Sequence, residues 1–264
     1  MGGLALVLFW PAVLAYSEAA LAYAGETIRP GRPSRYAIWG VRLGWLAQTA
    51  LLVTQASAAE GFPWSSWAGS LNLFVWMCVS AYLIWGCRAP FRLLGLAVMP
   101  PAAVLLAIAG AAGAARTGST GFGTVFLAAH VGLVLAAFAG FTIAAGLAGV
   151  YLWQERALKR RSPRLLRVRA PSLTTLDTLI GRTILVALPA LTIGIGIGFA
   201  RLQGEGVRLD GVIVATLVAW FLYAAFLLLR HEAGWHGRRA AQLALGGFAI
   251  VVAVRAGAFA MGHF

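Results

Sequence analysis

Charged residues are scarce in this sequence. They make up 11% of its 264 residues, and only eight of them are acidic. A soluble domain carries about twice that charged fraction, so the composition excludes a soluble globular protein. The sequence also shows no carboxylate pair, nucleophile–base pair or nucleotide-binding loop, and we therefore expect no enzymatic activity.

Cysteine is almost absent as well. Cys78 and Cys87 are nine residues apart, the first lies inside an apolar run, and they form no CxxC motif. The two thiols therefore support neither a disulfide framework nor a thiol relay, and ordinary packing is the simpler interpretation.

Hydrophobic residues dominate instead, at 61% of the chain, and the mean hydropathy is +0.83. Apolar runs of about 20 residues, the length that crosses a bilayer as a helix, recur along the whole sequence. Because backbone polar groups at membrane depth must be satisfied within their own helix, the sequence predicts an all-α, polytopic transmembrane helix bundle. We expect a single integral membrane domain over residues 1–264, with about eight spanning helices, at 2–24, 37–58, 67–87, 91–113, 130–153, 178–200, 210–230 and 240–260.

Arginine and lysine are distributed unevenly among the predicted loops. Fifteen lie in the loops after the first, third, fifth and seventh segments, and three lie in the others. The positive-inside rule makes the first group cytoplasmic, so both termini are expected to face outward. The same rule explains the net charge of +13, and we expect contact with the lipid bilayer and none with nucleic acid.

Two histidines are expected at one depth on the external face. Counting back about 22 residues from Trp153, which precedes a basic loop, puts His130 at the outer boundary. Counting about 20 residues forward from Arg239 leaves His263 just outside. Neutral imidazoles are common ligands of haem iron and of zinc, and without a carboxylate or thiolate nearby the pair favours a bis-histidine haem. The alternative is that each is simply an interfacial polar residue.

Three further residues lie near this face. Arg255 comes about two turns before His263 on the same helix, where it could meet a haem propionate. Trp64 and Trp67 lie in the external loop after the second segment. They are interpreted either as an aromatic belt at the membrane interface or as a shelf for a flat ligand.

The remaining polar and small residues of the helices have structural interpretations. Glu18 and Arg42 could pair between the first two helices, and Arg182, five residues after Asp177, could snorkel to the cytoplasmic boundary. His231 and His236 are interpreted as solvated loop residues. Two GxxxG motifs predict close helix contacts, at Gly40 and Gly44 and at Gly194 and Gly198.

Three stretches resemble the cytochrome c assembly family, of the CcsA and HemX type: PWSSWAGSLNLFVW, LDTLIGRTILVALPALTIGIGIG and GWHGRRAAQLALGGF. The core of the resemblance covers residues 60–264. It implies a haem-handling protein of the bacterial cytoplasmic (inner) membrane that uses haem b. It also implies that the family's two external haem-ligand histidines fall on His130 and His263.

The loop before the seventh segment departs from the family pattern. Full assembly members carry a WxWD signature there, whereas this chain reads RLQGEGVRLDG. Asp210 matches the aspartate, but the tryptophans are absent, so the chain is most similar to the short HemX-like branch. Asp210 joins Arg255, Trp64 and Trp67 as an expected haem contact.

The resemblance leaves two functions open. The first is a haem-binding or haem-transporting protein that works with a cytochrome c assembly partner. The second is a membrane regulator of tetrapyrrole synthesis, which controls the abundance of glutamyl-tRNA reductase through its cytoplasmic loops.

Overall fold

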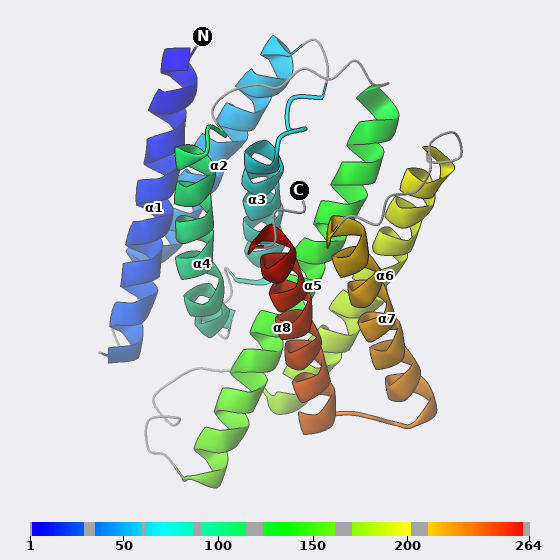
Figure 1. Cartoon of the computed structure of the whole chain (residues 1–264). Coiled ribbons are helices and arrows are strands. Elements are labelled where there is room, and N and C mark those ends of the chain that lie inside the picture. Colours follow the sequence, from blue (N-terminus) through cyan, green and yellow to red (C-terminus); the bar gives the residue numbers. More distant parts are fainter. Residues whose placement is uncertain are drawn as a thin grey trace. The chain divides into compact units, whose positions relative to one another are not determined.

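The computed structural model describes residues 2–28, 35–59, 62–86, 91–114, 124–161, 171–201 and 211–260 (Figure 1). These ranges contain eight helices and no strand, so the predicted all-α class is confirmed. The helices follow the order of the eight expected segments: α1 (Gly2–Ile28), α2 (Arg35–Ala58), α3 (Trp67–Gly86), α4 (Arg92–Ala111), α5 (Thr124–Lys159), α6 (Leu173–Arg201), α7 (Gly211–Glu232) and α8 (Arg238–Ala260).

Six of these helices are long and apolar enough to cross a membrane, namely α1, α3, α4, α5, α6 and α7. The α2 helix falls short of that criterion because it carries Arg42, Gln48 and Gln55 among its apolar residues. The side chains of α8 are described only as far as Val254. The polytopic helical architecture is therefore confirmed, while membrane crossing by α2 and α8 stays a prediction.

The α5 helix is longer than expected. It runs for 36 residues without interruption, about 54 Å at the rise of an α-helix, against a hydrocarbon core of about 30 Å. The sequence placed the start of this segment at residue 130, whereas the helix begins at Thr124. His130 therefore lies within the helix, near the end of its second turn.

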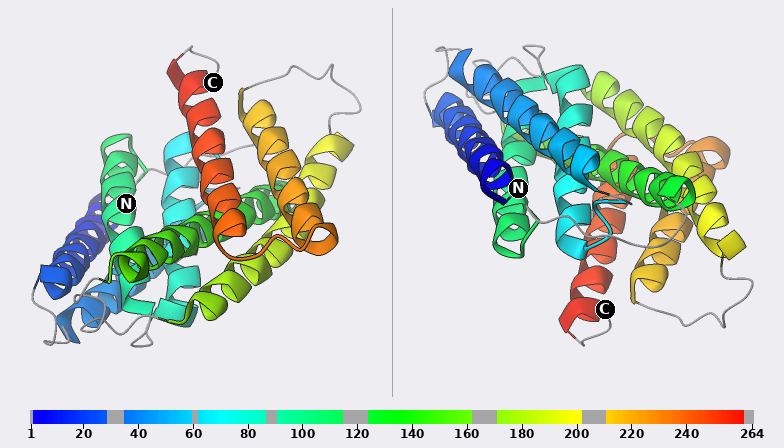
Figure 2. Two further views of the ribbon diagram at one scale, coloured as in Figure 1. Left: turned by 90° about the horizontal axis from the view of Figure 1, so that it is seen from below. Right: turned by 90° about the horizontal axis from the view of Figure 1, so that it is seen from above.

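The described helices fall into two compact units. One comprises residues 1–131 and 163–170, and the other comprises residues 132–162 and 171–264, so that the start of α5 belongs to the first. Within the first unit, α1 packs against α2 and α4, and α3 packs against α4 (Figure 2). Within the second unit, α7 packs against α6 and α8 (Figure 1, Figure 2).

Glycine sets the contact between α1 and α2. A Cβ atom on Gly40 would lie 2.6 Å from Glu18 Oε2, and one on Gly44 would lie 2.6 Å from Tyr16 Cε1. On α6, a Cβ atom on Gly194 would lie 2.8 Å from Val134 Cγ2 of α5. The close approaches predicted from Gly40, Gly44 and Gly194 are therefore confirmed.

A buried hydrogen-bond network links the first three helices. The Tyr16 hydroxyl donates to Gln48 Oε1 at 2.8 Å, and Gln48 Nε2 donates to Asn72 Oδ1 at 2.8 Å and to the Asn72 carbonyl at 3.0 Å. All three side chains are fully buried. Since no water competes for these groups in an apolar interior, the network fixes the register of α1, α2 and α3.

The expected Glu18–Arg42 ion pair is not formed in the described structure. Arg42 lies over the ring of Trp39, with its guanidinium carbon 5.6 Å from the ring centroid, while the Glu18 carboxylate lies against Gly40. Both charged side chains are exposed. Because Gly40 has no Cβ, the Glu18 carboxylate can lie close to α2 at this position.

Candidate functional site

The structure describes only part of the predicted haem site. His130 lies on α5 with a partly exposed side chain. His263 and Asp210 lie outside the described residues, and Arg255 lies on α8 with its side chain outside them. The proposed pairing of His130 with His263 therefore stays a prediction.

Trp64 anchors the loop that leads into α3. Its indole Nε1 donates to Gln55 Oε1 at 2.9 Å, and the buried Gln55 in turn donates through Nε2 to the Ala114 carbonyl at 2.7 Å. The ring also makes an edge-to-face contact with Phe62, at 5.6 Å between centroids. These contacts tie the loop to α2 and to the turn that follows α4.

Trp67 differs from Trp64 in its exposure. It is the first residue of α3, and 49% of its surface is accessible. Ser66 precedes it as the N-cap, because Ser66 Oγ accepts a hydrogen bond from the Gly69 amide at 3.1 Å. Of the two tryptophans, Trp67 has the more accessible ring, which suits either an interfacial belt or a flat ligand.

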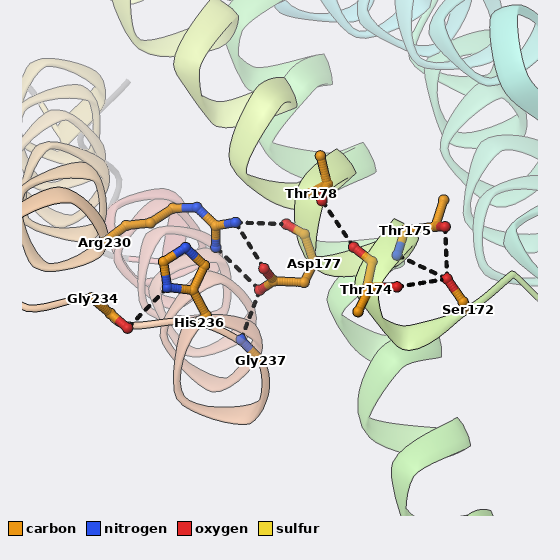
Figure 3. Close-up of polar contacts among 9 residues, drawn as sticks. All are labelled: Ser172, Thr174, Thr175, Asp177, Thr178, Arg230, Gly234, His236 and Gly237. Atoms are coloured by element: carbon orange, nitrogen blue, oxygen red, sulfur yellow. Dashed lines mark hydrogen bonds and ion pairs between the residues drawn. The ribbon is translucent and has the colours of Figure 1, made fainter.

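A second set of polar contacts lies at the other end of α5, where α6, α7 and α8 meet (Figure 3). Asp177 on α6 forms a two-pronged ion pair with Arg230 near the end of α7: Arg230 Nη2 lies 2.8 Å from Oδ2, and Nη1 lies 3.1 Å from Oδ1. The Gly237 amide donates to Asp177 Oδ1 at 2.8 Å. We call Asp177, Arg230 and Gly237 the Asp177 clamp.

Local sequence positions both partners of the ion pair. Ser172 caps α6 by accepting a hydrogen bond from the Thr175 amide at 3.1 Å, which places Asp177 in the second turn. Gly181 lies one turn later. A Cβ atom there would be 2.6 Å from Arg230 Nε, so glycine leaves room for the guanidinium against α6. The side chains of Asp177 and Arg230 are consequently only 12% and 16% exposed.

Asp177 also completes the start of α8. The first amides of a helix have no partner inside the helix, and a carboxylate there both accepts a hydrogen bond and meets the positive end of the helix dipole. Gly237 immediately precedes α8, and its amide is the one that Asp177 binds. A carboxylate from α6 therefore serves as the cap of α8.

The loop between α7 and α8 has a defined conformation. Gly234 and Gly237 adopt the left-handed region, with φ of 62° and 68°. The Trp235 amide donates to the Leu229 carbonyl at 3.1 Å, across the left-handed Gly234, and this bond closes the end of α7. His236 Nδ1 lies 2.9 Å from the Gly234 carbonyl oxygen, so the ring of His236 is held against its own loop (Figure 3).

Glu155, near the end of α5, is also paired. Glu155 contacts Lys159 at 2.6 Å and Arg238 at 3.8 Å, which joins the end of α5 to the start of α8. The exposed side chains around it are mainly basic, namely Arg156, Lys159, Arg160, Arg161, Arg238 and Arg239. This end of the second unit therefore presents a positively charged surface.

Sequence reasoning missed the Asp177 clamp. It linked Asp177 only with Arg182, but residues five apart on a helix lie about 140° apart around its axis. Arg182 is exposed and Arg230 takes its place. Two signals were available: Asp177 and Arg230 both lie at the predicted cytoplasmic boundary, and Gly181 follows Asp177 by one turn.

Comparisons with known proteins show which family this chain is similar to. The model of the family described as cytochrome C assembly protein matches residues 64–255. A cytochrome c biogenesis protein CcsA from Prochlorococcus marinus (strain MIT 9303) is 26% identical over 245 residues, which cover 80% of this chain and 77% of the relative. The protein of that name from Synechococcus sp. (strain CC9902) is 28% identical over 238 residues, covering 79% and 78%. No solved structure is significantly similar to the chain.

Proposed function

Since the chain belongs to the cytochrome c assembly protein family, we propose that it handles haem in the bacterial cytoplasmic membrane as part of cytochrome c biogenesis. In this proposal, His130 and His263 hold haem b at the extracytoplasmic face, and Arg255 pairs with a propionate. Asp210, Trp64 and Trp67 line the same face. The role is one of binding and presenting haem, with no chemical step by the chain itself.

The family match carries this proposal. It spans the chain from Trp64 to Arg255 and so includes His130 and every helix from α3 to α7. The matched relatives are called cytochrome c biogenesis proteins. A partner from the cytochrome c assembly machinery is the corresponding expectation for this chain.

Path lengths along two helices support the choice of ligands. The Glu155–Arg238 contact brings the end of α5 to the start of α8. From that contact, His130 lies about 25 residues back along α5, and the end of α8 lies about 22 residues forward, which correspond to roughly 37 and 33 Å. Since His263 follows the end of α8 by three residues, similar helix lengths separate both histidines from the basic end.

A haem spectrum tests the ligand pair. Replacing His130 or His263 by alanine is expected to abolish a six-coordinate, low-spin spectrum of the purified, haem-loaded protein, because each removes one axial ligand. Added imidazole should partly restore that spectrum. The matched control is His231→Ala, which should leave it unchanged. A low-spin spectrum that survives both single substitutions would rule out this pair.

Labelling from outside the cell tests the orientation. With Cys78 and Cys87 replaced, a cysteine at Ser119 should react with an impermeant reagent in intact cells, and a cysteine at Ser162 should react only after the cells are opened. The reason is the fifteen-to-three distribution of basic residues among the loops. Labelling of position 162 in intact cells would show that the orientation is the opposite of the one proposed.

A second candidate function is regulation of tetrapyrrole synthesis, through an effect on glutamyl-tRNA reductase abundance. The loop sequence RLQGEGVRLDG favours it, because that loop lacks the tryptophans of the full assembly members. The genes beside this one discriminate the two functions. Cytochrome and thioredoxin-like genes favour assembly, and tetrapyrrole-synthesis genes favour regulation.

A further inference from the structure

We propose that two copies of this chain dimerise in the membrane through the outer face of α1 and α2, where Glu18 of each copy pairs with the partner subunit's Arg42. The inference concerns assembly and does not depend on haem binding. It starts from two charges that both have exposed side chains, and neither of them forms an ion pair within the described residues. An unpaired charge that faces lipid is costly, so each is expected to have a partner.

Glu18 lies deep within its helix. It belongs to the part of α1, Val7–Gly25, that is long and apolar enough to cross a membrane. Its position is roughly 15 Å before Ile28, the last residue of α1. The short glutamate side chain cannot reach the end of the helix across that length, so it needs a cationic partner at its own depth.

Arg42 lies at nearly the same depth as Glu18. A Cβ atom on Gly40 would be 2.6 Å from Glu18 Oε2, so the carboxylate lies at the level of Gly40 on the neighbouring helix. Arg42 follows Gly40 by two residues, which is about 3 Å along the axis of α2. That difference is shorter than an arginine side chain, so depth allows the two charges to meet.

Within one chain, however, α2 itself separates the two charges. Gly40 faces α1, because a Cβ atom there would lie against Glu18 and Ala15. Two residues correspond to about 200° around a helix, so Arg42 points away from α1. Its guanidinium carbon instead lies 5.6 Å from the centroid of the Trp39 ring. Arg42 therefore lies on the edge of α2 that is far from Glu18.

Two-fold symmetry brings the separated charges together. Copies of a membrane protein insert in the same orientation, so the two-fold axis of a dimer runs along the membrane normal. Rotation about that axis keeps every atom at its depth and exchanges the two sides of the face. The edge of α2 that points away from its own α1 then meets the partner's α1. Arg42 comes to the partner subunit's Glu18, and the same contact is repeated on the other side of the axis.

Exposed apolar side chains surround both charges. On each helix they repeat every seven residues, which is the spacing of helices that pack side by side. These residues are Val7, Leu14 and Leu21 on α1 and Trp39, Leu46 and Val53 on α2. Such rows suit lipid as well as protein, but Glu18 lies between Leu14 and Leu21, and Arg42 lies between Trp39 and Leu46. The charges favour protein, and one acid with one base at one level makes the face complementary to itself.

The experiment measures dimerisation of the full-length chain in lipid vesicles. Energy transfer between donor-labelled and acceptor-labelled chains is followed over a range of protein-to-lipid ratios, and we expect the unsubstituted protein to dimerise. Glu18→Arg or Arg42→Glu alone places like charges at both contacts and should weaken dimerisation at least about tenfold. The control is Arg182→Glu, which reverses an exposed arginine of α6 and should leave dimerisation unchanged.

Mixing the two variants tests the pairing itself. Chains with Glu18→Arg and chains with Arg42→Glu carry opposite charges at both contacts of a mixed dimer, so together they should regain most of the original energy transfer. The doubly substituted chain should also dimerise with itself. An ion pair inside one chain cannot produce the effect of mixing, because each single variant carries two like charges. A misfolded chain would not be rescued by mixing, so recovery also excludes a folding defect.

Three results would overturn the proposal. The first is an unsubstituted protein that stays monomeric at every protein-to-lipid ratio. The second is a dimer that neither charge reversal weakens. The third is a mixture of the two variants that associates no better than each variant alone. If a reversed charge prevents folding, Glu18→Gln keeps the size of the side chain and removes its charge from both contacts. Dimerisation of that folded variant at full strength would equally contradict the pairing.

Discussion

Replacing Asp177 by alanine is expected to lower the free energy of unfolding by about 3 kcal/mol. The substitution leaves the Arg230 guanidinium without its counter-ion in a largely buried position and removes the acceptor of the Gly237 amide. Breaking a buried ion pair by removing one partner costs about 3–5 kcal/mol, because the remaining charge is left uncompensated. The partial exposure of this pair places the expected loss at the lower end.

Thermal unfolding of the detergent-solubilised protein measures this loss of stability. Two comparison variants identify its cause. Asp177→Asn keeps an acceptor for Gly237 but loses the charge, so its destabilisation should be smaller. Glu155→Ala removes an acid whose partners, Lys159 and Arg238, are 61% and 56% exposed, and such pairs contribute at most about 1 kcal/mol. If Asp177→Ala were no more harmful than Glu155→Ala, the clamp would have no special role in stability.

The clamp also orders the loop between α7 and α8. Because Asp177 binds the Gly237 amide, its loss should free the loop beside His236 before the rest of the unit unfolds. Hydrogen exchange at the start of α8 should therefore increase in Asp177→Ala.

The sequence predicted the helices well because one physical length governs them. An apolar run must cross a hydrocarbon core of about 30 Å, so counting residues locates each segment. The count fails where a helix continues beyond the core. The start of α5 was placed at residue 130 although the helix begins at Thr124 and ends at Lys159, because helical hydrogen bonds extend into flanking residues that hydropathy alone does not assign.

Side-chain partners were predictable only where one residue alone determines the contact. Gly40 and Gly44 predicted a close approach because glycine has no side chain to hold a neighbouring helix away. The partner of Asp177 lies 53 residues away, and helical periodicity relates only residues on one helix. The predicted Glu18–Arg42 ion pair also joined residues on two helices. Opposite charges on adjacent helices do not specify which side chains face each other, so this prediction failed.

Replacing Gly44 by alanine is expected to destabilise the first unit by about 2 kcal/mol. A helix interior normally gains about 1 kcal/mol when glycine becomes alanine. Here the new Cβ would lie 2.6 Å from Tyr16 Cε1, and Tyr16 is fully buried with its hydroxyl bound to Gln48. Overpacking costs about 1–3 kcal/mol, and strain on a hydrogen bond between membrane helices adds about 0.6–2 kcal/mol. The unfavourable effects therefore prevail over the gain in helix propensity.

Gly25→Ala on α1 is the matched control for Gly44→Ala. A Cβ atom at Gly25 would meet nothing within 4 Å, so this variant should be neutral or slightly stabilised. Combining Gly44→Ala with Tyr16→Leu removes the ring that the new methyl group would strike. The double variant should therefore lose less stability than the two single losses added together. Additive losses, or equal stability of Gly44→Ala and Gly25→Ala in thermal unfolding, would show that α1 and α2 do not depend on this contact.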